Sequence, residues 1–299
     1  MRNPAAIDAE RLNLGVRVAD LAELTKPRIT LMVVLTAGIG LWLASGGEVS
    51  LGLALHTLLG TGLLAAGSSA LNQVLEQDLD ALMTRTADRP LPAGRMDPDV
   101  ALIFGVALSI VGLLELTVFV NLLVALLGTV ALAGYIFLYT PLKRVSSLAT
   151  VIGAIPGAIP PLMGWAAVTD RLDAGAWVLF GILFLWQLPH FLAIAWMCRE
   201  DYARAGLPML PVVEPDGRST ARQMVLYGAA LLPVSLLPTV LGLTGPTYFL
   251  GTLTLGCFFL GVCVVFALRF STQAARRVLL VSVFYLPAVL LVMVLDRVV

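Results

Sequence analysis

The stretch "DVALIFGVALSIVGLLELTVFVNLLVALLGTVALAGYIFLYT", residues 99–140, decides the fold. Between Asp99 and Thr140 it has one charged residue, Glu115. A helix that crosses a bilayer needs roughly 20 predominantly apolar residues, so this stretch predicts two spans, at about 99–116 and 119–140. It lacks the alternation of polar and apolar residues that is typical of membrane strands, which favours helices over a barrel.

The rest of the chain repeats this pattern. The protein has 299 residues, of which 59% are hydrophobic and 13% are charged, with a mean hydropathy of +0.94. Soluble domains are about 45–50% apolar and about 25% charged. We therefore predict an all-α integral membrane protein with about nine transmembrane helices in a bundle. The seven other apolar runs lie at about 29–46, 52–73, 146–168, 174–196, 223–242, 247–269 and 278–296.

This pattern divides the chain into an N-terminal arm, residues 1–28, and a single transmembrane domain, residues 29–296. Two polar loops interrupt the domain, at about 74–98 and 197–222. With the N-terminus inside the cell, all 19 Lys and Arg residues except Arg171 and Arg297 fall on the cytoplasmic side, as the positive-inside rule requires. Both loops are then cytoplasmic. The three cysteines lack the spacing of a metal site or a disulfide framework. We expect a lipid bilayer around the protein and no nucleic-acid partner.

The segment "NQVLEQDLD", residues 72–80, carries acidic residues at the inner end of the second span. Asn72, Glu76 and Asp80 are spaced i, i+4 and i+8, so on a helix they share one face. Carboxylate and amide oxygens are hard ligands that suit Mg²⁺, and we predict that these three are catalytic and bind the metal. Asp78 points to another side of an ideal helix and is the weaker candidate ligand. The alternative is a solvated acidic helix end.

Basic residues follow the acidic segment. Arg85 and Arg89 are four residues apart, and guanidinium groups bind phosphate oxygens bidentately. With the acids they predict a diphosphate ligand. The positive-inside rule alone also explains arginines here, and for Arg95 it is the main explanation. Lys143, in "YIFLYTPLKR" (residues 135–144), is a further candidate catalytic and phosphate-binding residue, although an interfacial anchor would look the same.

A second constellation lies in "FLWQLPHFLAIAWMCREDY", residues 184–202. Gln187 and His190 are polar groups within an apolar helix, and Pro189 frees a backbone carbonyl there. Polar and ionisable groups inside spans are functional candidates. A charged cluster follows in the next loop, with Arg199 as a candidate diphosphate ligand and Glu200 and Asp201 as weaker candidate metal ligands.

Five segments together resemble the UbiA superfamily of membrane prenyltransferases, and within it the haem-prenylating branch. They are "LTKPRI" (24–29), "NQVLEQDLDALMTRTADRPL" (72–91), "YTPLKR" (139–144), "WQLPHF" (186–191) and "REDYARAGLPMLP" (199–211). The superfamily usually has Asp where this chain has Glu76, and many members have two Asp four apart where this chain has Glu200 and Asp201.

The resemblance implies nine helices and two acidic motifs that bind a prenyl diphosphate through Mg²⁺. It implies transfer of a farnesyl group from farnesyl diphosphate to a vinyl group of haem B, giving haem O, in a bacterial inner membrane with a cytoplasmic active site. It also implies haem A synthase or a terminal oxidase as protein partners. The residues it assigns to haem binding are Trp186, Gln187, His190 and Tyr202.

Three alternatives remain from the sequence. The first is a prenyltransferase with a quinone-type or chlorophyll-type acceptor, against which "WQLPHF" argues. The second is a multi-span transporter, although transporters place their polar groups near the bilayer midplane whereas these acids gather at one membrane face. The third is a structural or assembly protein, which would not need Asn72, Glu76 and Asp80 in register.

Overall fold

The computed structural model describes residues 18–298, and this part of the chain is helical apart from its connections and one isolated bridge between Thr244 and Arg297. Nine helical segments within it are long and apolar enough to cross a membrane, so the predicted all-α bundle of nine spans is confirmed. Most of the predicted arm, residues 1–17, lies outside the described residues.

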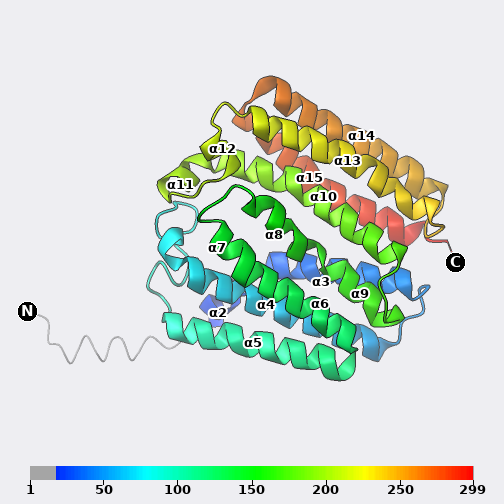
Figure 1. The fold of residues 1–299 in the computed structure, drawn as a ribbon. Helices are drawn as coiled ribbons and strands as arrows, with labels where there is room; N and C mark the ends of the chain where they lie inside the picture. The colour runs from blue at the N-terminus through cyan, green and yellow to red at the C-terminus, as the bar shows by residue number, and fades with distance from the viewer. Residues whose placement is uncertain (1–17, 299) are drawn as a thin grey trace, which may run out of the picture.

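The nine spans follow one another along the chain, with short helices between some of them (Figure 1). The fourth span is built from three consecutive pieces and the fifth from two. The spans are α3 (Pro27–Ala44), α4 (Leu51–Asp80), α5 (Pro98–Phe119), α6 with η1 and α7 (Leu122–Ala133, Gly134–Tyr139, Thr140–Leu142), α8 with α9 (Ala149–Ala158, Pro160–Thr169), α10 (Ala174–Met197), α13 (Arg218–Val240), α14 (Pro246–Arg269) and α15 (Thr272–Leu295). The short helices are α2 (Val18–Leu24), α11 (Arg199–Arg204) and α12 (Leu210–Val213).

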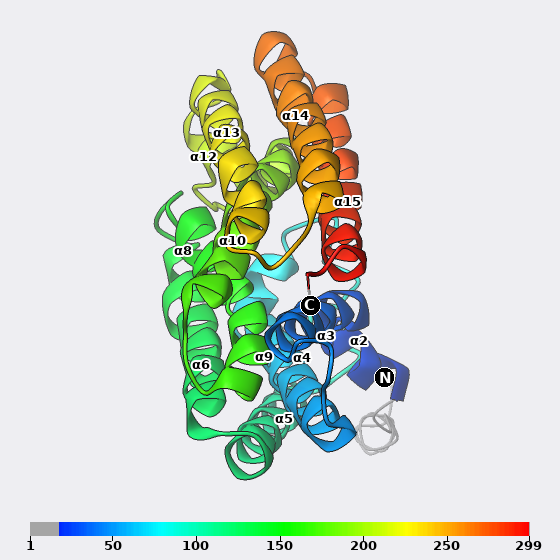
Figure 2. The same cartoon turned by 90° about the vertical axis from the view of Figure 1, so that its right-hand side faces the viewer.

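The helices pack in two groups that α10 joins. In one group α4 packs on α5 and α3 packs on α9. In the other, α14 packs on α13 and α15, and these two helices pack on α10 (Figures 1 and 2). The close crossing of α3 and α9 depends on glycine, because a Cβ at Gly164 would overlap the carbonyl oxygen of Ala37 and one at Gly40 would overlap that of Pro161. Small residues allow membrane helices to approach closely in this way.

The second span is longer than its apolar run. The sequence predicts a helix over about 52–73, but α4 continues to Asp80 and begins with Ser50 as N-cap, whose hydroxyl accepts from the Leu53 amide. The additional two turns carry Glu76 and Asp80 out of the apolar run as continuous helix. The polar loop therefore begins at Ala81, and it runs alongside α11 and α12 at one end of the bundle (Figure 1).

Candidate active site

The three predicted metal ligands lie on one buried face of α4. Asn72, Glu76 and Asp80 have relative exposures of 3%, 3% and 1%. A buried carboxylate is costly unless it is paired with an opposite charge. The helical register predicted from the sequence is present, and burial makes the alternative of a solvated acidic helix end untenable. We call these three residues the α4 stripe.

Each member of the α4 stripe bonds a different cation. The Lys26 ammonium donates to Asn72 Oδ1 at 3.2 Å, and the Lys143 ammonium donates to both oxygens of Glu76 at 2.9 and 3.0 Å. The Arg89 guanidinium donates to Asp80 Oδ2 at 2.6 Å. These cations come from three separate segments of the chain: the α2–α3 junction, the end of the fourth span and the loop after α4. The fold therefore assembles a cluster in which three cationic side chains alternate with three side chains that offer oxygen atoms.

Lys26 is the residue of this cluster that the sequence predictions missed. Its backbone is left-handed (φ +47°), which is unusual for a residue with a side chain. Burial and, next, the neighbouring Arg89 lower the pKa of Lys26 to about 8. One signal was available: the chain has only two lysines, Lys26 and Lys143, and both bond the α4 stripe.

A π-helical segment brings Lys143 to the stripe. Pro141 has no amide hydrogen to donate, and η1 widens the fourth span directly before it. The Thr140 hydroxyl donates to the Tyr135 carbonyl at 2.9 Å and accepts from the Asn72 amide at 3.2 Å. The Lys143 ammonium lies 5.6 Å from the centre of the Tyr139 ring. The segment thus presents Thr140 and Lys143 to α4, while the Tyr139 ring packs against Gly153 of α8.

The loop after α4 and the segment after α10 meet at the same end of the bundle. The Arg85 guanidinium lies 5.9 Å from the centre of the buried Tyr202 ring and donates to its hydroxyl at 3.5 Å. The Thr84 amide donates to Asp201, which also pairs with Arg204 at 3.1 Å. Arg85 and Tyr202 are thereby placed together, although the sequence assigned them to different ligands.

Several candidates lie apart from the α4 stripe. Asp78 is 60% exposed and pairs with Arg144 at 2.7 Å, on another side of α4, as its helical position predicted. Glu200 is exposed. The Arg199 guanidinium donates to the Trp196 carbonyl and stacks on the Trp196 ring, 5.0 Å from its centre. The metal-binding and phosphate-binding roles of these residues remain predictions.

The four predicted haem-binding residues divide into three places. Trp186 and His190 stack with ring centres 5.1 Å apart and both contact α15, where the Trp186 indole donates to the Ser282 carbonyl. Gln187 faces α8 instead, and its amide donates to the Ala154 carbonyl at 3.0 Å. Tyr202 lies with Arg85.

The hydrogen bonds of Ser282 fix the tautomer of His190. The Ser282 hydroxyl donates its one hydrogen to the Leu279 carbonyl at 2.6 Å, so it must accept from His190 Nδ1, which lies 2.7 Å away. In a neutral imidazole the other nitrogen, Nε2, then carries the lone pair. Metal-binding histidines are oriented by such a bond at their second nitrogen. In this tautomer His190 can donate the Nε2 lone pair to a Lewis acid such as a metal ion.

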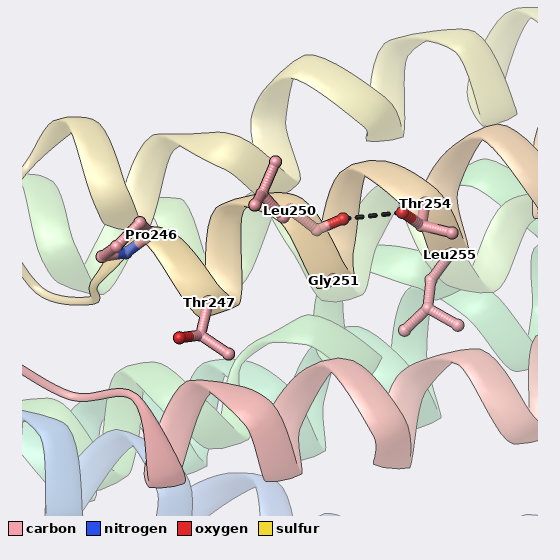
Figure 3. Close-up of a pocket in the computed structure, with 6 residues that line it drawn as sticks. All are labelled: Pro246, Thr247, Leu250, Gly251, Thr254 and Leu255. Carbon is pink, nitrogen blue, oxygen red and sulfur yellow. Dashed lines mark hydrogen bonds between the residues drawn. The ribbon is translucent and has the colours of Figure 1, made fainter.

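Two apolar hollows lie away from this chemistry. One, of about 670 Å³, is lined by α14 residues near the first turns of that helix, none of them charged (Figure 3). It lies at the opposite end of the bundle from the loop after α4 (Figure 1). The other, of about 310 Å³, lies between the fourth span and α8 and includes the exposed Phe137 and Leu138. Neither includes a residue of the α4 stripe.

The α4 stripe fits Mg²⁺ bound jointly with a substrate. Among the described residues, no three His, Cys, Asp or Glu side chains are grouped so that they could hold a metal by themselves. Glu76 and Asp80 supply two carboxylates, and Asn72 adds an amide oxygen. Mg²⁺ in proteins is usually held by one or two carboxylates together with substrate phosphates and water, which is the kind of donor set that the stripe offers.

Comparisons with known proteins agree with this fold. The family model of the UbiA prenyltransferase family matches residues 33–292. A protoheme IX farnesyltransferase from Solibacter usitatus (strain Ellin6076) is 54% identical over 287 residues, which cover 93% of this chain and 98% of the relative. A solved structure of digeranylgeranylglyceryl phosphate synthase has a TM-score of 0.79 at 17% identity, over 93% of this chain and 98% of that one.

A UbiA homolog from Archaeoglobus fulgidus, solved with bound GPP and Mg²⁺, has a TM-score of 0.60 at 13% identity and covers 92% of this chain and 99% of its own. At such identities the two solved structures support the fold, whereas the family model and the relative cover nearly the whole sequence at a level that identifies the family. The chain belongs to the UbiA prenyltransferase family.

Proposed function

We propose that this enzyme transfers a farnesyl group from farnesyl diphosphate to a vinyl group of haem B and so forms haem O. The relatives that share about half of its sequence are named protoheme IX farnesyltransferases, and a structural neighbour binds GPP with Mg²⁺. The single observation that carries the assignment of the site is the α4 stripe, in which each buried oxygen donor bonds a cation from a different segment.

The cluster is suited to a ligand that carries both negative and positive charge, such as a diphosphate with bound Mg²⁺. Asn72, Glu76 and Asp80 would hold Mg²⁺, which supplies positive charge against the departing diphosphate. Lys26, Lys143 and Arg89 would then turn from the stripe to phosphate oxygens, with Arg85 as a further phosphate ligand. In this exchange every buried charge retains an opposite charge, so substrate binding avoids the cost of leaving one unpaired.

The chemistry begins with ionisation of the diphosphate. The bond between C1 of the farnesyl group and the bridging oxygen breaks, and diphosphate keeps the electron pair. The three cations of the cluster stabilise the charge that develops on diphosphate, in a setting where water cannot screen it. The faces of Tyr135 and Tyr139, whose ring centres are 5.2 Å apart, can stabilise the allylic cation.

A carbon–carbon bond then forms between C1 and the outer carbon of the haem vinyl group. The inner vinyl carbon becomes a cation, takes up one water molecule and loses a proton, which leaves a hydroxyl group. The balance is haem B, farnesyl diphosphate and water giving haem O and diphosphate. Because the farnesyl chain must not be hydrolysed, water has to be excluded from C1 until the carbon–carbon bond is made.

His190 is the best candidate for a haem ligand. Its Nδ1 hydrogen is committed to Ser282, so Nε2 is available to the iron. Trp186 stacks on His190 and would support a porphyrin edge beside it. We place the diphosphate end of the site on the cytoplasmic side of a bacterial inner membrane, because the Lys and Arg residues favour that orientation and diphosphate is water-soluble.

The test is a direct assay with the purified protein, haem B, farnesyl diphosphate and Mg²⁺. The expected result is the mass of haem O and release of one diphosphate per haem consumed, both lost when EDTA replaces Mg²⁺. Prenylation of a quinone precursor in place of haem would overturn the proposed acceptor. Absence of any prenyl transfer in a protein that binds haem would overturn the proposed reaction.

A further inference from the structure

We infer that Arg95 is a positioning residue of the diphosphate site, which acts through the short helix α2 on Lys26. The inference rests on the proposed function, since it takes Lys26 to be a phosphate ligand. From the sequence, the positive-inside rule was the main explanation for Arg95, which the structure places in a defined set of contacts.

Arg95 joins the loop after α4 to α2 through three acceptors. Its guanidinium lies 3.1 Å from Asp20 Oδ1 and 2.8 Å from Glu23 Oε2, and it donates to the Asp88 carbonyl at 2.9 Å. The Asp20 side chain is 3% exposed and its second carboxylate oxygen has no hydrogen-bond partner in the described structure. Arg95 is thus the ion-pair partner that compensates the burial of Asp20.

The end of α2 is fixed against α4 next to the stripe. Leu24 is fully buried against Ala70 and Leu91, and its carbonyl accepts from the Gln73 amide at 2.8 Å. Gln73 directly follows Asn72, the residue that Lys26 bonds. The anchoring of α2 therefore fixes the backbone at Leu24, two residues before Lys26 in the sequence. This in turn sets where the Lys26 side chain meets the stripe.

The backbone of Lys26 shows why this anchoring matters. Lys26 separates α2 from α3 in a left-handed conformation (φ +47°, ψ +65°). Such conformations cost energy for a residue with a side chain and persist when the surroundings enforce them. Pro27 at the first turn of α3 fixes one side of Lys26, and α2 held by Arg95 fixes the other. Without Arg95, the buried Asp20 carboxylate of α2 has no counter-ion among residues 18–298, and the geometry that aims Lys26 at Asn72 is no longer enforced.

The experiment measures binding of farnesyl diphosphate to the full-length protein in the presence of Mg²⁺, for Arg95→Ala, Lys26→Ala and the double variant. Because Arg95 acts through Lys26, we expect each single variant to raise the Kd about tenfold and the double variant to match Lys26→Ala alone. Arg95→Lys should recover part of the affinity. Haem affinity should be unchanged in all of them.

Arg144→Ala is the matched control. Arg144 has the same side-chain exposure as Arg95, 39%, and like Arg95 it forms an ion pair, but its partner is the exposed Asp78 of α4. It should leave the Kd unchanged. If Arg95→Ala does not fold, adding Asp20→Asn removes the unpaired buried carboxylate, and this double variant should still raise the Kd because α2 no longer has its ion pairs to the loop after α4.

Multiplicative effects in the double variant, or an unchanged Kd in Arg95→Ala with only a lower Tm, would overturn the inference and leave Arg95 as a purely structural residue. If the wild-type protein itself does not bind farnesyl diphosphate, it is the proposed function that fails, and the two outcomes are thereby distinguished.

Discussion

The C-terminal end of α4 and the C-terminal half of α10 are both polar interruptions of apolar helices, yet their polar groups are paired in different ways. At α4 two of the three polar groups are carboxylates and the third is an amide, and each bonds a cation from outside α4. At α10 they are neutral, and they bond backbone carbonyls or Ser282. Buried charges require opposite charges, so the α4 site exists only when the α2–α3 junction, the end of the fourth span and the loop after α4 have come together on α4. The α10 groups each need a single neighbouring helix.

This contrast leads us to expect that the two regions serve different substrates and fail separately. The α4 stripe suits a highly charged ligand, and the stacked rings of Trp186 and His190 on α10 suit a flat, largely apolar one.

Loss of one carboxylate from the α4 stripe should have the largest effect. Glu76→Gln or Asp80→Asn keeps the size of the side chain but removes the charge that would hold Mg²⁺ against diphosphate. We expect turnover to fall by about 10²–10³-fold, the usual effect of removing a group that stabilises developing charge. The measurement is haem O formation under saturating substrates, with membrane insertion checked in parallel. Near-normal turnover in both variants contradicts the metal-binding role.

Removal of His190 should chiefly affect haem. His190→Ala removes Nε2, so the haem-bound protein should lose the spectroscopic signature of histidine ligation and bind haem at least about tenfold more weakly. Ser282→Ala, which frees His190 without removing it, should show a smaller effect in the same direction. Absorption and electron paramagnetic resonance spectra provide the measurement. If neither spectrum nor affinity changes, His190 is structural.

The arginines of the loop after α4 should change the affinity for the diphosphate. Arg89→Ala should raise the KM for farnesyl diphosphate about tenfold or more, because a charged hydrogen bond to phosphate is lost and Asp80 remains buried without its partner. Arg85→Ala should have a smaller effect, since Arg85 lies against Tyr202 rather than against the stripe. Steady-state kinetics at saturating haem measures the KM for farnesyl diphosphate in each variant. If the KM is unchanged in both, these arginines only set the orientation of the protein in the membrane, as the positive-inside rule describes.

Neutralisation of Asp78 should have the smallest effect, although it lies only two residues from Glu76 and from Asp80. Asp78 is exposed and its ion pair with Arg144 is a surface pair, of a kind that contributes about 0–1 kcal/mol. Asp78→Asn should change neither turnover nor Mg²⁺ dependence by more than about twofold. A large loss here, equal to that of Asp80→Asn, contradicts the division of α4 into a functional face and a solvated one.

The fold and the stripe could be predicted from the sequence because each depends on local repetition. Apolar runs of span length fix the number of helices, and the spacing of Asn72, Glu76 and Asp80 fixes their common face. The separation of Asp78 from that face follows from the same geometry.

The partners of the stripe could not be predicted, because they depend on contacts between distant segments. Lys143 and Arg89 were expected to bind phosphate, and in the structure they form ion pairs with Glu76 and Asp80. Lys26 was missed because its role depends on a left-handed turn before Pro27. Trp186 and Gln187 are neighbours in sequence, but they face α15 and α8 respectively.

The central claim is that two separate clusters hold the two substrates, and crossed binding measurements test it most directly. Farnesyl diphosphate with Mg²⁺, and haem B alone, are each titrated into the wild-type protein, Asp80→Asn and His190→Ala. We expect Asp80→Asn to lose diphosphate binding and keep haem binding, and His190→Ala to do the reverse. Loss of the same ligand in both variants would contradict the claim.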